Sequence, residues 1–266
     1  MQRISLNDYL SSKSSWPRRL LGWEHFALER TETNVEAEYN QDRYTPLLAL
    51  TSGRMEDYKV QEFANLGMER DSPMFVSFGD EIFSTSLRLA RKHWCALIQS
   101  TVERFATGRI CELGCGYGFN LSILGKGAYG GEHSPAAVSL GHRLGMEVTR
   151  FNYYNSEDYS FIQPDSTILT VHSIEQIPSA EPFLQNLARY KDRIREVIHI
   201  EPSWLDERST FTGLIRNRYN ELIDHNHDLV KLLRQSQEIE MLHFESEVFG
   251  FHPLNSSHVT VWRFKP

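Results

Sequence analysis

The chain contains little cysteine and no concentration of basic residues. Only three of its 266 residues are cysteines, Cys95, Cys111 and Cys115, and three thiols cannot form a paired disulfide framework. No run of Lys and Arg is longer than two residues, and the formal net charge is -7. Proteins that bind nucleic acids usually carry a basic patch or stripe. We therefore expect reduced thiols, and a small or neutral partner rather than RNA or DNA.

Long hydrophobic runs are also absent. No apolar run reaches the roughly 18 residues that indicate a membrane-spanning helix, and the first residues lack the hydrophobic region and cleavage site of a signal peptide. With 40% hydrophobic and 24% charged residues, the composition is that of an ordinary globular protein. We expect a cytoplasmic protein that is neither exported nor inserted in a membrane.

Two groupings of metal-ligand residue types occur, and neither predicts a metal site. Cys111 and Cys115 have C-x-x-x-C spacing, but no second Cys/His pair of zinc type accompanies them. His225 and His227 lie in a helical apolar pattern, and residues two apart on a helix do not face each other. We expect these two histidines on a solvated helix surface.

The most informative segment is a short apolar strand at 110–113 that ends in alternating glycines. Gly114, Gly116 and Gly118 follow it directly, and an acid, Glu112, lies just before them. Glycines at such a strand-to-helix crossover allow a ligand to reach the backbone, because no Cβ atoms stand in the way. The first two satisfy the dinucleotide pattern G-x-G-x-x-G, but its third position falls on Phe119. The segment therefore predicts a nucleotide-like cofactor.

A second acid supports this reading. Glu132 closes a weak strand at 128–131, near the offset of about 20 residues expected for an acid that binds ribose hydroxyls. Together, E-L-G-C-G-Y-G and the later G-G-E-H-S-P resemble motif I and the second acidic motif of class I S-adenosylmethionine-dependent methyltransferases. The resemblance covers roughly residues 105–266 and implies S-adenosylmethionine as the cofactor.

The resemblance also implies a set of cofactor-binding residues. Glu132 would accept the ribose hydroxyls, and Glu112 with the backbone of 114–118 would lie by the methionine part. His133 would lie against the adenine; the alternative is that it is an exposed loop residue. Asn152 and Tyr153 fit the adenine position loosely, and the alternative for them is ordinary core packing. The full predicted set is Glu112, Gly114, Cys115, Gly116, Gly118, Glu132, His133, Asn152 and Tyr153.

Strand and helix patterns alternate from residue 87 to residue 200. A helix is predicted over 87–105, and strands at 110–113, 128–131, 147–151, 167–172 and 196–200 are separated mostly by helices. Such alternation predicts an α/β fold with a parallel sheet. The runs at 240–249 and 258–264 predict an antiparallel hairpin. The resemblance implies a Rossmann-like, mostly parallel seven-stranded sheet closed by that terminal hairpin.

The regions outside this alternation predict the domain organisation. Residues 1–84 contain several turn signals and predict short helices and loops, which we interpret as an N-terminal helical cap. Residues 85–266 form the predicted cofactor-binding core. Within it, the strongly helical segment 205–237 is longer than one crossover needs, and we interpret it as an inserted lid.

Candidate catalytic residues follow the fourth and fifth strands of the predicted sheet. Ligands of open parallel sheets lie beyond the carboxyl ends of the strands, where the sequence places His172 and Glu175, then His199 and Glu201. Histidine suits removal of a proton from a hydroxyl near neutral pH. Alternation along the strand puts His199 and Glu201 on one face. A buried His199 with satisfied hydrogen bonds is the alternative.

Three segments bear on the acceptor. H-S-I-E-Q-I-P, V-I-H-I-E-P and F-H-P-L-N-S-S-H-V-T-V-W are similar to a sugar O-methyltransferase group of bacterial natural-product pathways. That similarity implies methyl transfer to a hydroxyl of a small polar, sugar-like molecule. Methylation of an amine, an RNA or protein substrate, and a cofactor-binding regulator without turnover remain alternatives. The oligomeric state is open, with a homodimer among the choices.

Overall fold

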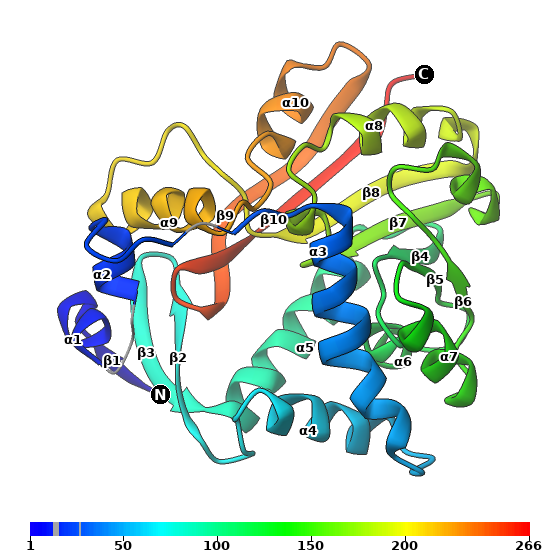
Figure 1. The fold of residues 1–266 in the computed structure, drawn as a ribbon. Coiled ribbons are helices and arrows are strands. Elements are labelled where there is room, and N and C mark those ends of the chain that lie inside the picture. The colour runs from blue at the N-terminus through cyan, green and yellow to red at the C-terminus, as the bar shows by residue number, and fades with distance from the viewer. Residues whose placement is uncertain (13–15, 27) are drawn as a thin grey trace.

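The computed structural model describes residues 1–12, 16–26 and 28–266, so residues 13–15 and 27 of the predicted cap lie outside the described part. One mixed sheet runs through the molecule, with helices on both of its faces (Figure 1). Its strands are β1 Gln2–Ile4, β2 Pro73–Phe78, β3 Glu81–Ser86, β4 Arg109–Leu113, β5 Tyr129–Glu132, β6 Val148–Arg150, β7 Ser166–Val171, β8 Ile194–Glu201, β9 Ile239–His252 and β10 Asn255–Phe264.

The helices fall into an N-terminal group and a later group along the chain. The N-terminal region contains α1 Leu6–Ser11, α2 Trp16–Leu20, α3 Glu32–Glu36, the π-helix η1 Ala37–Tyr44, the 3-10 helix η2 Thr45–Ala49 and α4 Met55–Asn65. The later helices are α5 Leu87–Phe105, α6 Phe119–Leu124, α7 Pro135–Arg143, α8 Glu181–Ala188, α9 Phe211–Leu222 and α10 Leu229–Gln235, with 3-10 turns η3 Ser156–Phe161, η4 Ile174–Gln176 and η5 Lys191–Arg193.

The strand order is β1-β3-β2-β9-β10-β8-β7-β4-β5-β6. The five strands from β8 to β6 pair in parallel, and β10 joins β8 antiparallel. The predicted α/β fold with a largely parallel centre and a terminal hairpin is confirmed. The predicted number of seven strands is wrong for the sheet as a whole, which has ten.

The three additional strands come from the region predicted to hold only short helices and loops. β2 and β3 form a hairpin, β1 adds to its edge, and one pair, Ser77 with Gly250, joins it to β9. The turn consists of Gly79 and Asp80, with Gly79 at φ 54°. Glycine adopts positive φ without a steric cost, and Gly-Asp is a hairpin signal. The sequence carried this signal, although the prediction missed it.

Strand alternation divides the core into two layers. Ile168 and Val197 face α8 and α10, whereas Leu169 and Ile198 face α5 on the other side of the sheet. Successive residues of a strand point to opposite faces, so strands covered on both sides read as continuous apolar runs. The helix predicted over 87–105 matches α5. The amphipathic helices therefore cover both faces of the sheet. The edge at which the parallel strands end stays free of them and can hold a site.

The N-terminal region packs against the start of the parallel sheet. Tyr44, Leu47 and Tyr58 form one buried cluster with Tyr117 and Ala137, so η1, η2 and α4 rest on α7 and on the loop before α6. Figure 1 shows α3 and the helix that continues it crossing in front of the strands, with α4 below. This arrangement covers the ends of β4 and β5.

Candidate functional site

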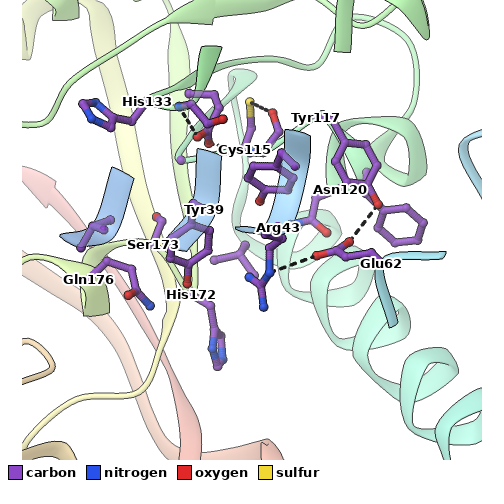
Figure 2. Close-up of a pocket in the computed structure, with 18 of the residues that line it drawn as sticks. Tyr39, Arg43, Glu62, Cys115, Tyr117, Asn120, His133, His172, Ser173 and Gln176 are labelled. Carbon is purple, nitrogen blue, oxygen red and sulfur yellow. Dashed lines mark hydrogen bonds and ion pairs between the residues drawn. The ribbon is translucent and has the colours of Figure 1, made fainter. Parts of the chain in front are cut away.

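A cavity of about 310 Å³ lies at the carboxyl ends of the parallel strands. Gly114, Glu132, Asn152 and His172 line it from the ends of β4, β5, β6 and β7, and η1 lies opposite with Tyr39 (Figure 2). Ligands of open parallel sheets bind at this edge, where the loops of neighbouring strands converge. The topology therefore brings most of the predicted site residues to one place.

The backbone of the loop after β4 requires glycine at two positions. Gly114 has φ 76°, and a Cβ there would lie 2.4 Å from Cβ of Ser173. Gly116 has φ 56°, and a Cβ there would lie 2.8 Å from the hydroxyl oxygen of Tyr44. Both positive φ values and both close approaches exclude a larger residue. The loop is thus held between β7 and the N-terminal region with its backbone exposed to the cavity.

The other two predicted residues of this loop have different surroundings. Cys115 is buried and lines the cavity. Gly118 forms the left-handed N-cap of α6, where a Cβ would meet Met146 at 2.8 Å. Gly118 does not line the cavity. Its role in this structure is to turn the chain into the helix.

Glu132 joins the glycine loop to the next strand. Its two carboxylate oxygens accept hydrogen bonds from the backbone N–H groups of Gly116 at 2.8 Å and Ser134 at 2.7 Å. Burial raises the pKa of this carboxyl group above its usual value. Each oxygen keeps a further acceptor position, and Glu132 lines the cavity. The carboxylate can therefore accept two more hydrogen bonds from a ligand.

Glu112 is completely buried beneath the loop. Its Oε1 accepts a hydrogen bond from Asn120 at 2.7 Å, whereas Oε2 has no partner among the described residues. Burial raises the pKa of Glu112 to about 8. Buried polar atoms normally have partners. Because Asn120 and Gly114 line the cavity and Glu112 does not, this acid supports the wall from behind.

The remaining predicted cofactor residues form the rim of the cavity. His133 lines it, and its Nε2 has no hydrogen-bond partner among the described residues. That atom lies 3.9 Å from the carboxylate of Glu32, which also accepts a hydrogen bond from Asn152. Tyr153 lies deeper and donates to the backbone oxygen of Leu113 at 2.8 Å. The rim therefore contains one buried imidazole nitrogen that the described residues leave unpaired.

His172 follows β7 and lines the cavity with its ring. Its φ of 51° is unusual for a residue other than glycine. Nδ1 lies 3.3 Å from Oε2 of Glu175, and Nε2 lies 2.7 Å from the hydroxyl oxygen of Ser257. Burial acts to lower the pKa of this imidazole, but the Glu175 carboxylate outweighs it and the net pKa is raised. The structure thus brings His172 and Glu175 together as a pair.

Glu175 is the centre of a buried polar cluster behind the cavity wall. It accepts hydrogen bonds from the side chains of Gln176 at 2.7 Å and Asn255 at 3.1 Å. Nδ1 of His225 lies 3.7 Å from its Oε2. Burial acts to raise the pKa of Glu175, but the two neighbouring imidazoles outweigh it and the pKa is lowered. The carboxylate is therefore held in its charged form.

The position of His225 corrects the prediction of a solvated helix surface. α9 ends at Leu222, and His225 lies in the loop before α10 with a relative exposure of 3%. Asn226 donates its backbone N–H to the carbonyl oxygen of Glu175, and its side-chain oxygen accepts a hydrogen bond from the backbone N–H of Leu229, the first residue of α10. These contacts hold the loop that carries His225 against the turn η4. His227 alone is exposed.

His199 and Glu201 lie outside the cavity wall. Nδ1 of His199 lies 2.7 Å from the Thr170 hydroxyl, and Nε2 accepts a hydrogen bond from the Trp262 indole at 2.9 Å. Burial lowers the pKa of this imidazole to about 3. His199 therefore has no free nitrogen, which corrects its predicted role as a base and agrees with the alternative of a satisfied core histidine.

Glu201 acts as a cap for the turn that carries Glu175. Its carboxylate accepts backbone hydrogen bonds from Ser173, at 2.9 and 3.0 Å, and from Ile174 at 3.1 Å. Burial, followed by the charge of Glu175, raises the pKa of Glu201. The carboxylate thus fixes the start of η4. Its position supports a positioning role rather than contact with a ligand.

Sequence reasoning missed several charged residues of the site, and two of them are Arg43 and Glu62. Arg43 projects from η1 into the cavity, and Glu62 of α4 forms part of the same wall (Figure 2). No local pattern around either residue distinguishes it from a surface charge. Among the described residues, no group of three or more His, Cys, Asp or Glu side chains is placed to hold a metal ion. Over the same residues, no helix is both long and apolar enough to cross a membrane.

Comparison with known proteins adds the fold family. No family model and no curated protein matches the sequence. Among solved structures, the chain is similar to magnesium protoporphyrin IX methyltransferase of Synechocystis PCC 6803 with bound SAH, at a TM-score of 0.52 and 11% identity over 88% of this chain and 100% of that one. The protein therefore has the fold of class I S-adenosylmethionine-dependent methyltransferases.

Two further similarities are weaker and carry no part of this conclusion. The mitomycin 7-O-methyltransferase MmcR matches at a TM-score of 0.43 and 13% identity, over 67% of this chain and 58% of that one. A possible histamine N-methyltransferase from Thermotoga maritima matches at a TM-score of 0.46 and 16% identity, over 67% of this chain and 92% of that one. 

Proposed function

We propose that the protein transfers a methyl group from S-adenosylmethionine to a hydroxyl group of a small polar acceptor. The observation that carries this proposal is the composition of one cavity wall. The cavity is lined by the glycine backbone at Gly114 and Gly116, which carries no Cβ atoms, and by the carboxylate of Glu132. It is also lined by the imidazole of His172, which is paired with a carboxylate behind the wall. The fold family supports the choice of cofactor.

The residues present fit the cofactor. Glu132 has acceptor positions for ribose hydroxyls, and the free Nε2 of His133 lies at the rim. The buried Oε2 of Glu112 has no partner in the described residues and can receive a hydrogen bond through the loop or a water. When bound, the cofactor supplies a methyl group on a positively charged sulfur, and its departure requires no proton.

The chain's own residues must align the acceptor and take up a proton. In neutral His172, Nδ1–H would donate to Glu175, and Nε2 would receive the proton of the acceptor hydroxyl. Nε2 now contacts Ser257, so that contact has to give way when the acceptor binds. Catalytic hydrogen bonds often form only in the complex. Glu175 then stabilises the imidazolium that results.

A second candidate is methyl transfer to an amine. The specific observation in its favour is that both ring nitrogens of His172 already have protein partners. An amine can lose its proton to water after transfer, so it needs only positioning. The two candidates differ in their response to loss of His172, which only hydroxyl methylation requires as a base. A regulator without turnover is distinguished by measuring transfer itself.

We further propose that residues 1–84 act as the cap and 205–237 as the lid of a core formed by 85–266. Tyr39 and Arg43 of the cap line the cavity, and Asn226 of the lid contacts the backbone of Glu175. The small volume of the cavity and the absence of basic runs favour a small molecule over a nucleic acid. A cytoplasmic location and a homodimer stay expectations.

Calorimetry with S-adenosylmethionine and with nicotinamide cofactors tests the proposal. We expect the first to bind and the second not to bind. Glu132→Ala should weaken binding by about tenfold or more, because it removes charged hydrogen-bond acceptors worth roughly 1.5–3 kcal/mol. Glu238→Ala removes an exposed carboxylate that accepts no hydrogen bond from the residues the structure describes, and it should leave binding unchanged. If S-adenosylmethionine does not bind, the proposed function is wrong.

A further inference from the structure

The cationic side chains of the cavity wall differ in how they are paired. Arg30, Arg43, Lys59 and Arg91 all line it. Three of them donate short hydrogen bonds to acids: Arg30 to Glu38 at 2.6 Å, Lys59 to Glu62 at 2.8 Å, and Arg91 to Glu56 at 2.8 Å through both terminal nitrogens. Each of these three cations is therefore already neutralised by an acid at hydrogen-bond distance. Arg43 is the exception.

Arg43 donates no hydrogen bond to any residue that the structure describes. Its ion pair with Glu62 joins Nε to Oε1 at 3.7 Å, and Glu62 already accepts hydrogen bonds from Lys59 and from Tyr117 at 2.9 Å. The guanidinium lies over the ring of Tyr39, 4.9 Å from its centroid. Its side chain is 29% exposed. The terminal nitrogens of Arg43 are therefore available in a largely buried place.

An arginine with unused terminal nitrogens matches one kind of ligand. The planar guanidinium presents a fork of donors that fits a carboxylate through two parallel hydrogen bonds. Arg43 belongs to the last turn of the π-helix η1, and such helices occur frequently at functional sites. In Figure 2 the side chains of Arg43 and His172 both point away from Cys115 and the glycine loop.

The cavity wall beside His172 is aromatic. Trp94 packs edge-on to His172 with ring centroids 5.1 Å apart. Phe251 lies against Trp94 at 6.4 Å and stacks on Phe63 at 5.7 Å. All of these residues line the cavity. Aromatic walls favour planar apolar ligands, because such rings pack edge to face or in offset stacks.

We propose that the acceptor is an aromatic acid with a ring hydroxyl, whose carboxylate binds Arg43, whose ring packs on Trp94 and Phe251, and whose hydroxyl faces His172. This inference rests on the proposed function and names the substrate class of the same site. The carboxylate belongs to the acceptor and not to the amino-acid end of the cofactor, and the two sources are separable by experiment.

The experiment is calorimetry on protein saturated with S-adenosylhomocysteine. The probes are 2-, 3- and 4-hydroxybenzoate and the corresponding hydroxybenzamides, which keep the ring and hydroxyl but lack the charge. At least one acid should bind about tenfold or more tightly than its amide, the difference expected for a charge-assisted hydrogen bond. Arg43→Gln should abolish this preference, and Arg43→Lys should retain only part of it because the fork is lost. Arg91→Gln, with its guanidinium used by Glu56, should preserve it.

The outcomes separate the inference from the proposed function. Binding of S-adenosylhomocysteine to each variant also shows that the variant is folded. If wild-type protein does not bind this nucleoside, the proposed function fails. If it binds the nucleoside but binds no acid more tightly than its amide, only the inference is overturned. Loss of nucleoside affinity in Arg43→Gln, with acid binding intact, would assign Arg43 to the cofactor's carboxylate and likewise overturn the inference.

Discussion

At the scale of single residues, His172 decides between the two candidate reactions. His172→Gln keeps a polar side chain of similar reach but removes the basic nitrogen. For hydroxyl methylation we expect kcat to fall by about a hundredfold or more, the usual contribution of a general base. Affinity for S-adenosylmethionine, measured by calorimetry, should stay within about twofold because the cofactor residues are untouched.

A matched control is available in the same sheet. His199→Gln changes a buried histidine that hydrogen-bonds Thr170 and Trp262 and does not line the cavity. It should lower thermal stability and leave kcat of the folded fraction nearly unchanged. Equal kcat values for wild type and His172→Gln would exclude His172 as the base and favour the amine as the acceptor.

The pairing of Glu175 with His172 sets the expected pH dependence of kcat/KM. A base works in its neutral form, so kcat/KM should rise with pH through the pKa of His172 in the free enzyme. Burial acts to lower that pKa, and the Glu175 carboxylate raises it above the ordinary value, with Glu201 adding to it and Arg43 opposing it. Glu175→Gln removes the largest raising influence, so the inflection in kcat/KM should move to lower pH. An inflection at higher pH would contradict the pairing.

Sequence patterns predicted the place of residues whose signal is local in the chain. Gly114, Gly116 and Glu132 line the cavity, as the glycine loop and an acid at a set distance indicated, and their contact with the cofactor stays a prediction. Arg43 and His225 were not predicted there, because each reaches the site from a segment far away in the sequence. Only the packing of η1 and of the loop before α10 brings them there. Their function follows from tertiary position, which local patterns do not encode.

At the scale of elements, the loop 223–228 of the proposed lid packs against the turn η4, which carries Glu175. Asn226 is 1% exposed, donates to the carbonyl oxygen of Ile177 at 3.0 Å and accepts a hydrogen bond from the backbone N–H of Leu229 at 2.9 Å. Asn226→Ala should lower the free energy of unfolding by about 1–3 kcal/mol, because it leaves buried backbone groups without partners. Denaturant unfolding measures this change. His227→Ala, at the exposed neighbouring position, should change it by less than about 0.5 kcal/mol.

The elements themselves show where sequence patterns are reliable. α5 was predicted with its observed ends because its apolar spacing extends over five turns. The β2–β3 hairpin was missed because each strand has only six residues and the apolar positions of Phe75, Val76 and Phe78 do not alternate cleanly. Short strands gain their stability from pairing rather than from propensity. Pairing with β3 and β9 therefore stabilises β2 as a strand, although its own sequence pattern does not indicate one.

At the scale of the whole molecule, the N-terminal region and the proposed lid are joined beside the cavity, which Arg30 lines. The backbone N–H of Leu28 donates to the carbonyl oxygen of Leu222 at 3.3 Å. Arg30 donates its backbone N–H to Asp224 at 2.8 Å and its Nε–H to the carbonyl oxygen of Ile223 at 3.2 Å. Both segments also border a second, open depression in the surface with Glu32.

Asp224→Ala tests whether this junction retains the cofactor. The substitution removes the acceptor for the Arg30 backbone N–H, and one such hydrogen bond contributes on the order of 1 kcal/mol. We expect S-adenosylhomocysteine to dissociate roughly fivefold faster in stopped-flow measurements, because opening the junction costs less free energy. Asp192→Ala, at an exposed position without a hydrogen bond from its side chain among the described residues, should leave the rate unchanged. An unaltered rate in Asp224→Ala would show that the ligand leaves without separating the two segments, and the lid would then be a fixed wall.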